Sequence, residues 1–162
     1  MQELRNCHIL QCMNITAPNA DLALRSGPDE GALVAVLEAA EELHERLEAA
    51  LAAVGLSLSK FDAMDQLVRA GEPMTLGSLA GRLHCVRSNV TQLVDRLEAE
   101  GFVQRGGCSE DRRAIRACVT PLGAERHAAG LEAIRSVQAR VAERLAPADR
   151  ARLLDLLAAL TR

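Results

Sequence analysis

Hydrophobic residues recur every three or four positions along most of this chain, which is the spacing that predicts helices. The longest unbroken pattern runs from Gly31 to Val54, and Gly55 follows it where glycine commonly ends a helix. Leucine and alanine dominate the apolar residues, whereas β-branched and aromatic runs are few, which also favours helix. The sequence therefore predicts a mainly helical protein with a minor β component.

Three shorter helices are expected in the middle of the chain. They run from Ser57 or Ser59 to about Ala70, from Thr75 to about His84, and from about Arg87 to Glu100. Serine or threonine at a helix start can accept hydrogen bonds from the free N–H groups of the first turn. The side chains expected to face the core are Phe61, Met64, Leu67, Val68, Leu76, Leu79, Ala80, Leu83, Val90, Leu93, Val94 and Leu97.

A hairpin and two further helices complete the pattern. Residues 102–105 and 114–120 are the expected strands, joined by the glycine-rich segment GGCSEDRR. In the second strand Ile115, Ala117 and Val119 occupy alternate positions, so they are expected on its buried face. Thr120 and Pro121 predict the cap and the first residue of a long helix, and Pro147 begins a last one.

The helix pair at residues 75–100 and the hairpin after it suggest binding to duplex DNA. Two helices joined by a tight turn can place the second helix in the major groove. A basic hairpin directly after them can reach phosphates or the minor groove. From Arg82 to Arg116 there are seven arginines against five acidic residues, a local charge of +2 in a chain whose formal charge is −3. A basic region on an acidic protein predicts DNA contact through one face.

Other function classes find less support in the composition. No stretch approaches the roughly 18 uninterrupted apolar residues that span a bilayer, and the N-terminus lacks the order of a secretory signal, so no membrane contact and a cytoplasmic location are expected. No glycine-rich phosphate loop, Ser-His-Asp set or HExxH motif indicates an enzyme. The only aromatic rings of the Phe, Trp or Tyr type are Phe61 and Phe102, which disfavours single-strand binding by base stacking.

The terminal helices carry more apolar surface than a small helical core can cover. An amphipathic helix with an exposed apolar stripe would create a large hydrophobic patch. Packing the terminal helices of two copies together removes that patch, so a homodimer is expected.

Four segments, in this order and spacing, closely resemble the MarR family of winged helix-turn-helix regulators. They are LSLSKFDAMDQL, MTLGSLAGRL, SNVTQLVDRLEAEGFVQR and EDRRAIRACVTPLG, and the resemblance covers roughly residues 31 to 160. The most specific parts are VTQLVDRLEAEGFV and the Asp111-Arg112-Arg113 motif followed by VTPLG.

The resemblance implies an N-terminal extension at 1–30, partly ordered, and a MarR-like domain at 31–162. Within it the winged helix-turn-helix would span about 56–120, with dimerisation helices at about 31–54 and 121–160. Such homodimers read a pseudo-palindromic operator, require no cofactor, and usually repress transcription until an organic ligand, a metal or an oxidant releases them. A winged-helix adaptor that acts through protein contacts is the alternative, and activation in place of repression stays open.

The recognition helix implied by the resemblance spans residues 87 to 100. Its N-terminal part would meet base edges through Arg87, Ser88, Asn89, Thr91 and Gln92. Asparagine and glutamine suit adenine, and arginine suits guanine or phosphate. The alternative is that Ser88 only caps the helix and that Thr91 bonds to the backbone.

The implied wing carries Asp111, Arg112 and Arg113. Arg112, near the tip, is expected to contact the minor groove or phosphates, whereas Asp111 and Arg113 brace the wing and its approach to DNA. The alternative is an exposed, solubilising arginine pair.

Two positions depart from the family pattern. His84-Cys85 stands in the turn where many members have glycine and an apolar residue, and Val86 stands where serine is common. The helix cap is therefore expected to be missing or displaced to Ser88, and the turn to be strained.

Four residues are candidates for sensing a signal. Cys7, His8 and Cys12 form a thiophilic ligand set for zinc or copper(I), although two or three ligands per chain leave a site incomplete without other donors. The same cysteines could instead form a redox switch, or be incidental. Cys108 stands among arginines, which favour a reactive thiolate. An organic ligand is the alternative signal; His44 and His127 would border its pocket by family analogy, although a structural role is simpler for both.

Overall fold

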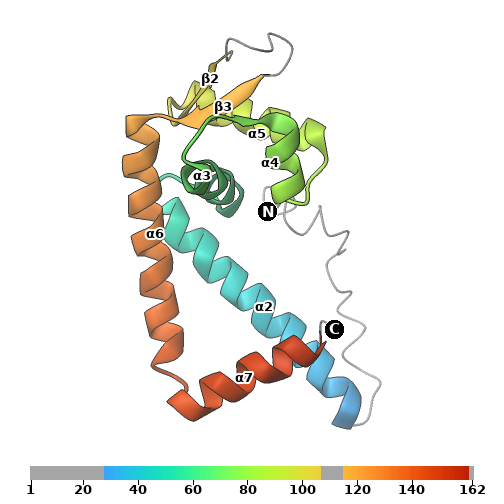
Figure 1. Cartoon of the computed structure of the whole chain (residues 1–162). Helices are drawn as coiled ribbons and strands as arrows, with labels where there is room; N and C mark the ends of the chain where they lie inside the picture. Colours follow the sequence, from blue (N-terminus) through green and yellow to red (C-terminus); the bar gives the residue numbers. More distant parts are fainter. Residues whose placement is uncertain (1–27, 107–114, 161–162) are drawn as a thin grey trace, which may run out of the picture.

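The computed structural model describes residues 28–106 and 115–160 (Figure 1). The helices follow the hydrophobic pattern closely, and three of them begin at the predicted hydroxyl caps Ser57, Thr75 and Thr120. The elements are α2 (Pro28–Ala52), α3 (Leu58–Ala70), β1 (Met74–Thr75), α4 (Leu76–Arg82), α5 (Arg87–Ala99), β2 (Val103–Gly106), β3 (Arg116–Val119), α6 (Pro121–Ala142) and α7 (Pro147–Leu160).

The three strands form one small antiparallel sheet in the order β1-β3-β2. Val103 pairs with Val119 and Gly106 with Arg116, so β2 and β3 form the base of the predicted hairpin. β1 pairs Met74 with Ala117 along the other edge of β3. The sequence did not predict β1, because a two-residue strand depends on a distant partner rather than on its own periodicity.

One hydrophobic core joins α3, α4, α5 and the sheet. Met64, Leu79, Val94 and Leu97 are completely buried in it, and Ala117 closes it from β3. The long helices meet the core at one end, where Leu51 of α2 is also completely buried. The expected winged helix-turn-helix architecture is thus confirmed.

α6 fits closely against the domain at two glycines. A Cβ at Gly123 would lie 1.9 Å from the carbonyl oxygen of Phe102, and one at Gly130 would lie 2.8 Å from the ring of Phe61. Arg126 also donates from Nη1 to the carbonyl of Val54 at 2.8 Å, linking α6 to the end of α2. These contacts fix the direction in which α6 leaves the core.

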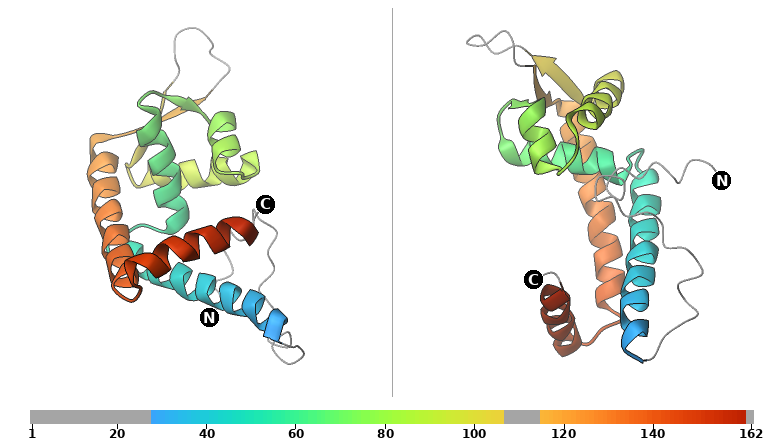
Figure 2. Two further views of the ribbon diagram at one scale, coloured as in Figure 1. Left: turned by 60° about the horizontal axis from the view of Figure 1, so that its bottom comes forward. Right: turned by 90° about the vertical axis from the view of Figure 1, so that its right-hand side faces the viewer.

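α7 stands apart from the rest of the fold. In the right-hand view of Figure 2 it lies on one side of α6 and α2 lies on the other, although α7 and α2 overlap in Figure 1. None of its residues is buried. Along the described ranges, no helix is long and apolar enough to cross a membrane.

Four sequence-based details need correction. α2 begins at Pro28, inside the residues 1–30 expected to form an extension. Val68 is 40% exposed because it lies on the outer side of the last turn of α3. Ile115 is 56% exposed because it precedes the first paired residue of β3. α4 ends at Arg82, before the expected His84.

Candidate nucleic-acid interface

The orientation of α5 is set by its apolar residues. Val90, Leu93, Val94 and Leu97 recur at helical spacing and are buried against the core. The opposite face is therefore turned away from the core, and at the N-terminal end it exposes Arg87, Ser88 and Gln92, whereas Asn89 and Thr91 are half-buried. The structure thus brings all five predicted base-reading residues together on the first two turns of α5.

For two of these five residues, Thr91 and Ser88, the structure shows whether the side chain bonds to the helix backbone. The Thr91 hydroxyl donates to the carbonyl oxygen of Arg87 at 3.0 Å, as one of the alternatives from sequence expected. Ser88 does not cap α5, because the N-cap is Val86, which makes no side-chain hydrogen bond to the helix. The missing cap predicted from sequence is confirmed, and its displacement to Ser88 is wrong.

The turn between α4 and α5 is a Schellman motif with an unusual residue. The N–H of Cys85 donates to Ala80 and the N–H of His84 to Gly81, at 3.0 and 3.3 Å. This geometry places His84 at φ 51°, in the left-handed region that favours glycine. Every other described residue with a positive φ is a glycine: Gly55, Gly71 and Gly101. The expected strain in this turn is therefore located at His84.

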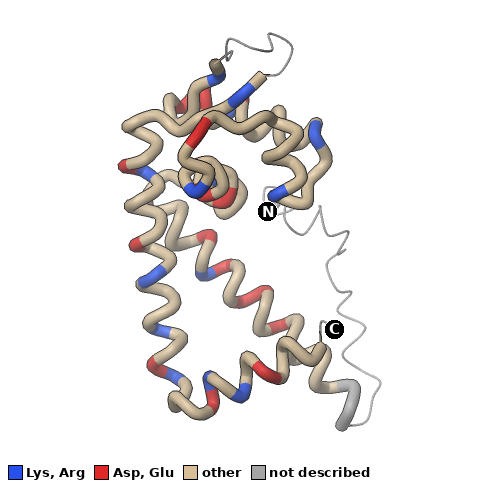
Figure 3. Tube along the Cα trace, viewed as in Figure 1, with Lys and Arg blue, Asp and Glu red and all other residues tan. Residues whose placement is uncertain are grey.

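Basic and acidic positions both lie around the helix-turn-helix, while α2 is mainly acidic and α6 carries both signs of charge (Figure 3). Arg82 and Arg87 lie at the end of α4 and at the start of α5, and both are exposed. Arg105 was expected to add to this basic surface, but its charge is paired with acidic side chains of the protein. It forms ion pairs with Asp95 and Glu98 of α5. These ion pairs were not expected from the sequence, although it contains two acids three residues apart on the helix and an arginine on the next strand.

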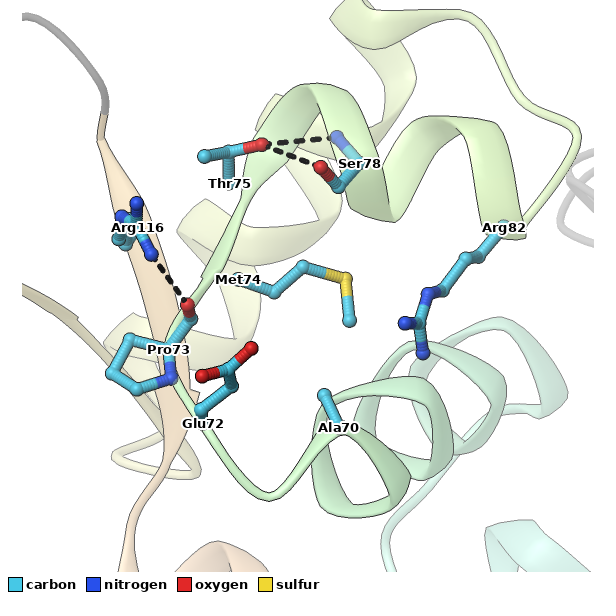
Figure 4. Close-up of a pocket in the computed structure, with 8 residues that line it drawn as sticks. All are labelled: Ala70, Glu72, Pro73, Met74, Thr75, Ser78, Arg82 and Arg116. Carbon is cyan, nitrogen blue, oxygen red and sulfur yellow. Dashed lines mark hydrogen bonds between the residues drawn. The ribbon is translucent and has the colours of Figure 1, made fainter.

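A pocket of about 230 Å³ lies between α3, β1, α4 and β3 (Figure 4). Arg82 and Arg116 approach it from opposite sides, and Glu72 lies between them. Arg116 donates from Nη1 to the carbonyl of Pro73 at 3.3 Å, and the hydroxyls of Thr75 and Ser78 lie 2.9 Å apart. The pocket is small and is lined by both acidic and basic side chains, so its lining does not indicate a particular class of ligand.

The residues proposed for the wing tip and for sensing lie outside the described residues. They are Asp111, Arg112, Arg113 and Cys108 in the hairpin, and Cys7, His8 and Cys12 in the N-terminal segment. Their roles stay predictions from sequence. Within the described ranges, no group of three or more His, Cys, Asp or Glu side chains could hold a metal ion.

The junction of α2, α3 and α6 contains partly buried ionisable groups. His127 of α6 stacks on Phe61 with the ring centroids 5.0 Å apart, and its Nε2 lies 3.1 Å from Oδ1 of Asp65. These contacts favour a structural role for His127, which was the simpler expectation from sequence. Nearby, burial raises the pKa of Asp62 from 3.8 to about 6, with smaller contributions from the charges of Asp65 and Glu48, against a lowering by His44.

Comparison with known proteins agrees with this geometry. Residues 56–115, which include α3, α4, α5 and β2, match the model of the MarR family. This chain carries a MarR family domain. Members of the family are transcriptional regulators rather than enzymes, in agreement with the expectation from sequence.

Individual relatives of the MarR domain extend the similarity. An uncharacterised helix-turn-helix regulator, YcgE of Bacillus subtilis (strain 168), is 40% identical over 79 residues, which are 49% of this chain and 49% of that relative. The match thus spans about half the length of this curated relative. AbsC, a MarR family transcriptional regulator from Streptomyces coelicolor, is 26% identical, with a TM-score of 0.72 over 85% of this chain and 95% of that one.

A solved complex shows a similar protein on DNA. The transcriptional repressor CouR, bound to a 23-mer DNA duplex, is 25% identical to this chain, with a TM-score of 0.69 over 79% of this chain and 90% of CouR.

Replacing His84 by glycine tests the strain in the turn. Glycine adopts the left-handed conformation without the Cβ clash, so His84→Gly should raise the free energy of unfolding by about 1 kcal/mol. Urea unfolding followed by circular dichroism measures this change. Gly101→Ala, at the equivalent position after α5 and at φ 76°, should lower stability by a similar amount. A less stable His84→Gly protein would show that the histidine side chain stabilises the turn.

Replacing Asp62 by asparagine tests the raised pKa. The native state holds this proton more tightly than the unfolded chain, so the stability it contributes is present below pH 3.8 and is lost as the pH rises through about 6. Asp62→Asn should therefore be the more stable protein at pH 7.5, by about 1 kcal/mol after allowance for partial solvent exposure, and the gain should vanish near pH 4. The measurement is unfolding at a series of pH values, with Asp155→Asn on the exposed α7 as the control. Parallel curves for wild type and Asp62→Asn would contradict the shift.

Proposed function

We propose that this chain is a sequence-specific, duplex-DNA-binding transcriptional repressor that acts as a homodimer in the cytoplasm. The observation that carries the proposal is the outward presentation of the first two turns of α5 by a buried core, within a domain that matches the MarR family. An α-helix held this way fits the major groove, where each base pair shows a distinct pattern of donors and acceptors.

The proposed base contacts follow from side-chain chemistry and exposure. Gln92 is exposed and can bond to adenine through two atoms, and the half-buried Asn89 can do the same. Arg87 is exposed at the helix start, where it reaches guanine or a phosphate. Ser88 adds a phosphate contact beside it, while Thr91 can still accept a hydrogen bond.

The proposed dimer rests on α7 and the first half of α2. Leu153, Leu156, Leu157 and Leu160 follow helical spacing on α7 and are 38–64% exposed, and Leu33 of α2 is 60% exposed. A monomer would leave this apolar surface in water. Two copies joined there would carry two α5 helices, the number required to read an operator with two half-sites.

The signal that releases the DNA is proposed to be an organic ligand, an oxidant or a thiophilic metal. The oxidant and metal alternatives rest on Cys7, His8, Cys12 and Cys108. Titration of peroxide, zinc and copper(I) against the DNA complex separates them. If none of these treatments releases the DNA in a way that Cys7→Ser/Cys12→Ser or Cys108→Ser abolishes, a cysteine sensor is excluded and an organic ligand is favoured.

Substitutions on α5 test the proposed base reading. The wild-type protein should bind duplex containing its gene's own upstream inverted repeat more tightly than a shuffled duplex, with steep salt dependence. Asn89→Ala and Gln92→Ala should each weaken operator binding about tenfold and leave shuffled-duplex binding unchanged. Gln138→Ala, an exposed glutamine on α6, is the matched control. Equal wild-type affinity for the two duplexes, measured by fluorescence anisotropy, would exclude a specific repressor and favour the adaptor alternative.

A charge on α7 tests the proposed dimer. Leu160 is 64% exposed, so Leu160→Glu should not disturb the monomer fold, but it would bury a charge in the dimer interface. Light scattering should give twice the 17.4 kDa chain mass for wild type and the single-chain mass for the variant. Asp155→Arg, on the polar side of the same helix, should remain dimeric. A monomeric wild-type protein at micromolar concentration would contradict the proposal.

A further inference from the structure

Arg105 of β2 joins the strand at the base of the hairpin to the recognition helix. Its guanidinium forms ion pairs with Asp95 through Nη1 and with Glu98 at 3.4 Å, and it donates from Nη2 to the carbonyl of Thr91 at 3.2 Å. Its backbone N–H also donates to Oε1 of Glu98 at 3.0 Å. One residue thus contacts α5 at three positions spread over two helical turns.

These contacts constrain two elements that the chain itself connects at only one point. α5 ends at Ala99 and β2 begins at Val103, so the backbone holds them together only at the C-terminal end of α5. Thr91 and Asp95 lie earlier in the helix, toward the proposed base-reading residues. Arg105 therefore adds contacts between the strand and α5 at positions well before the connection at residues 100–102.

The contacts of Arg105 are better suited to orienting α5 relative to β2 than to stabilising the folded state. The Asp95 and Glu98 side chains are 53% and 40% exposed, and ion pairs this exposed contribute little to folding. Within the described part of the chain, Nε of Arg105 is buried without a hydrogen-bond partner, which is unfavourable. A planar guanidinium is nevertheless needed, since it alone can span two carboxylates and a carbonyl from one position.

We propose that Arg105 is a positioning residue for operator binding, which sets the angle between the hairpin and α5 through Asp95 and Glu98. The inference rests on the proposed DNA-binding function. It assigns to two acidic residues, which repel DNA phosphates, a role that favours binding. If Asp95 and Glu98 position Arg105, neutralising them should lower operator affinity. If they act only by repelling phosphates, neutralising them should raise it.

The experiment uses an Asp95→Asn/Glu98→Gln double variant of the full chain. If the acids act only through charge, their removal strengthens binding to every duplex. If they hold Arg105, operator affinity falls about tenfold while affinity for shuffled duplex is unchanged or higher. Glu72→Gln/Glu125→Gln removes two exposed carboxylates that have no ion-pair partner among the described residues, and should bind both duplexes at least as tightly as wild type.

Two further measurements complete the test. Arg105→Lys should give an intermediate operator affinity, because an ammonium reaches one carboxylate but not all three acceptors. The thermal midpoint of the double variant should change by no more than about 2 °C, which separates orientation from folding. Operator binding by the double variant as tight as wild type, or tighter, overturns the inference. If wild type itself does not prefer the operator, the proposed function fails instead.

Discussion

The burial of one face of α5 is the constraint on which the candidate interface depends. Val90, Leu93, Val94 and Leu97 can enter the core only if the helix is rotated so that residues 87, 88 and 92 face outward. The core that receives them is built by α3, α4 and the small sheet, and α6 is locked to it by the close contacts at Gly123 and Gly130. The exposed polar surface is thus a geometric consequence of apolar packing elsewhere.

The beginning of α5 departs from the local rules that the other helix ends obey. Ser57, Thr75 and Thr120 cap their helices through side-chain oxygens, whereas Val86 offers none. Glycine takes the left-handed position after α2, α3 and α5, whereas His84 takes it after α4. Both departures fall in the turn between α4 and α5, directly before the helix proposed to read DNA. Unfavourable local conformations of this kind are commonly found at functional sites.

The sequence was sufficient for the elements whose signals are local. Hydroxyl caps and apolar spacing placed the helices, and the alternation around Ala117 placed β3. Even the strained turn was foreseen, because His84-Cys85 replaces residues that fit it better. Three of the missed features are tertiary: β1 exists only through β3, Ile115 is exposed because the ladder starts one residue later, and Arg105 contacts α5 only because the chain folds back at Gly101.

The most direct test of the central claim is methylation protection of guanine N7 on the gene's upstream inverted repeat. If α5 reads the major groove, two segments should be protected, related by the dyad of the repeat and about 10 base pairs apart centre to centre or a multiple of that. Asn89→Ala/Gln92→Ala should reduce the protection in both segments equally. Protection of neither half-site by the wild-type protein, at concentrations where the DNA is bound, would contradict major-groove reading by α5.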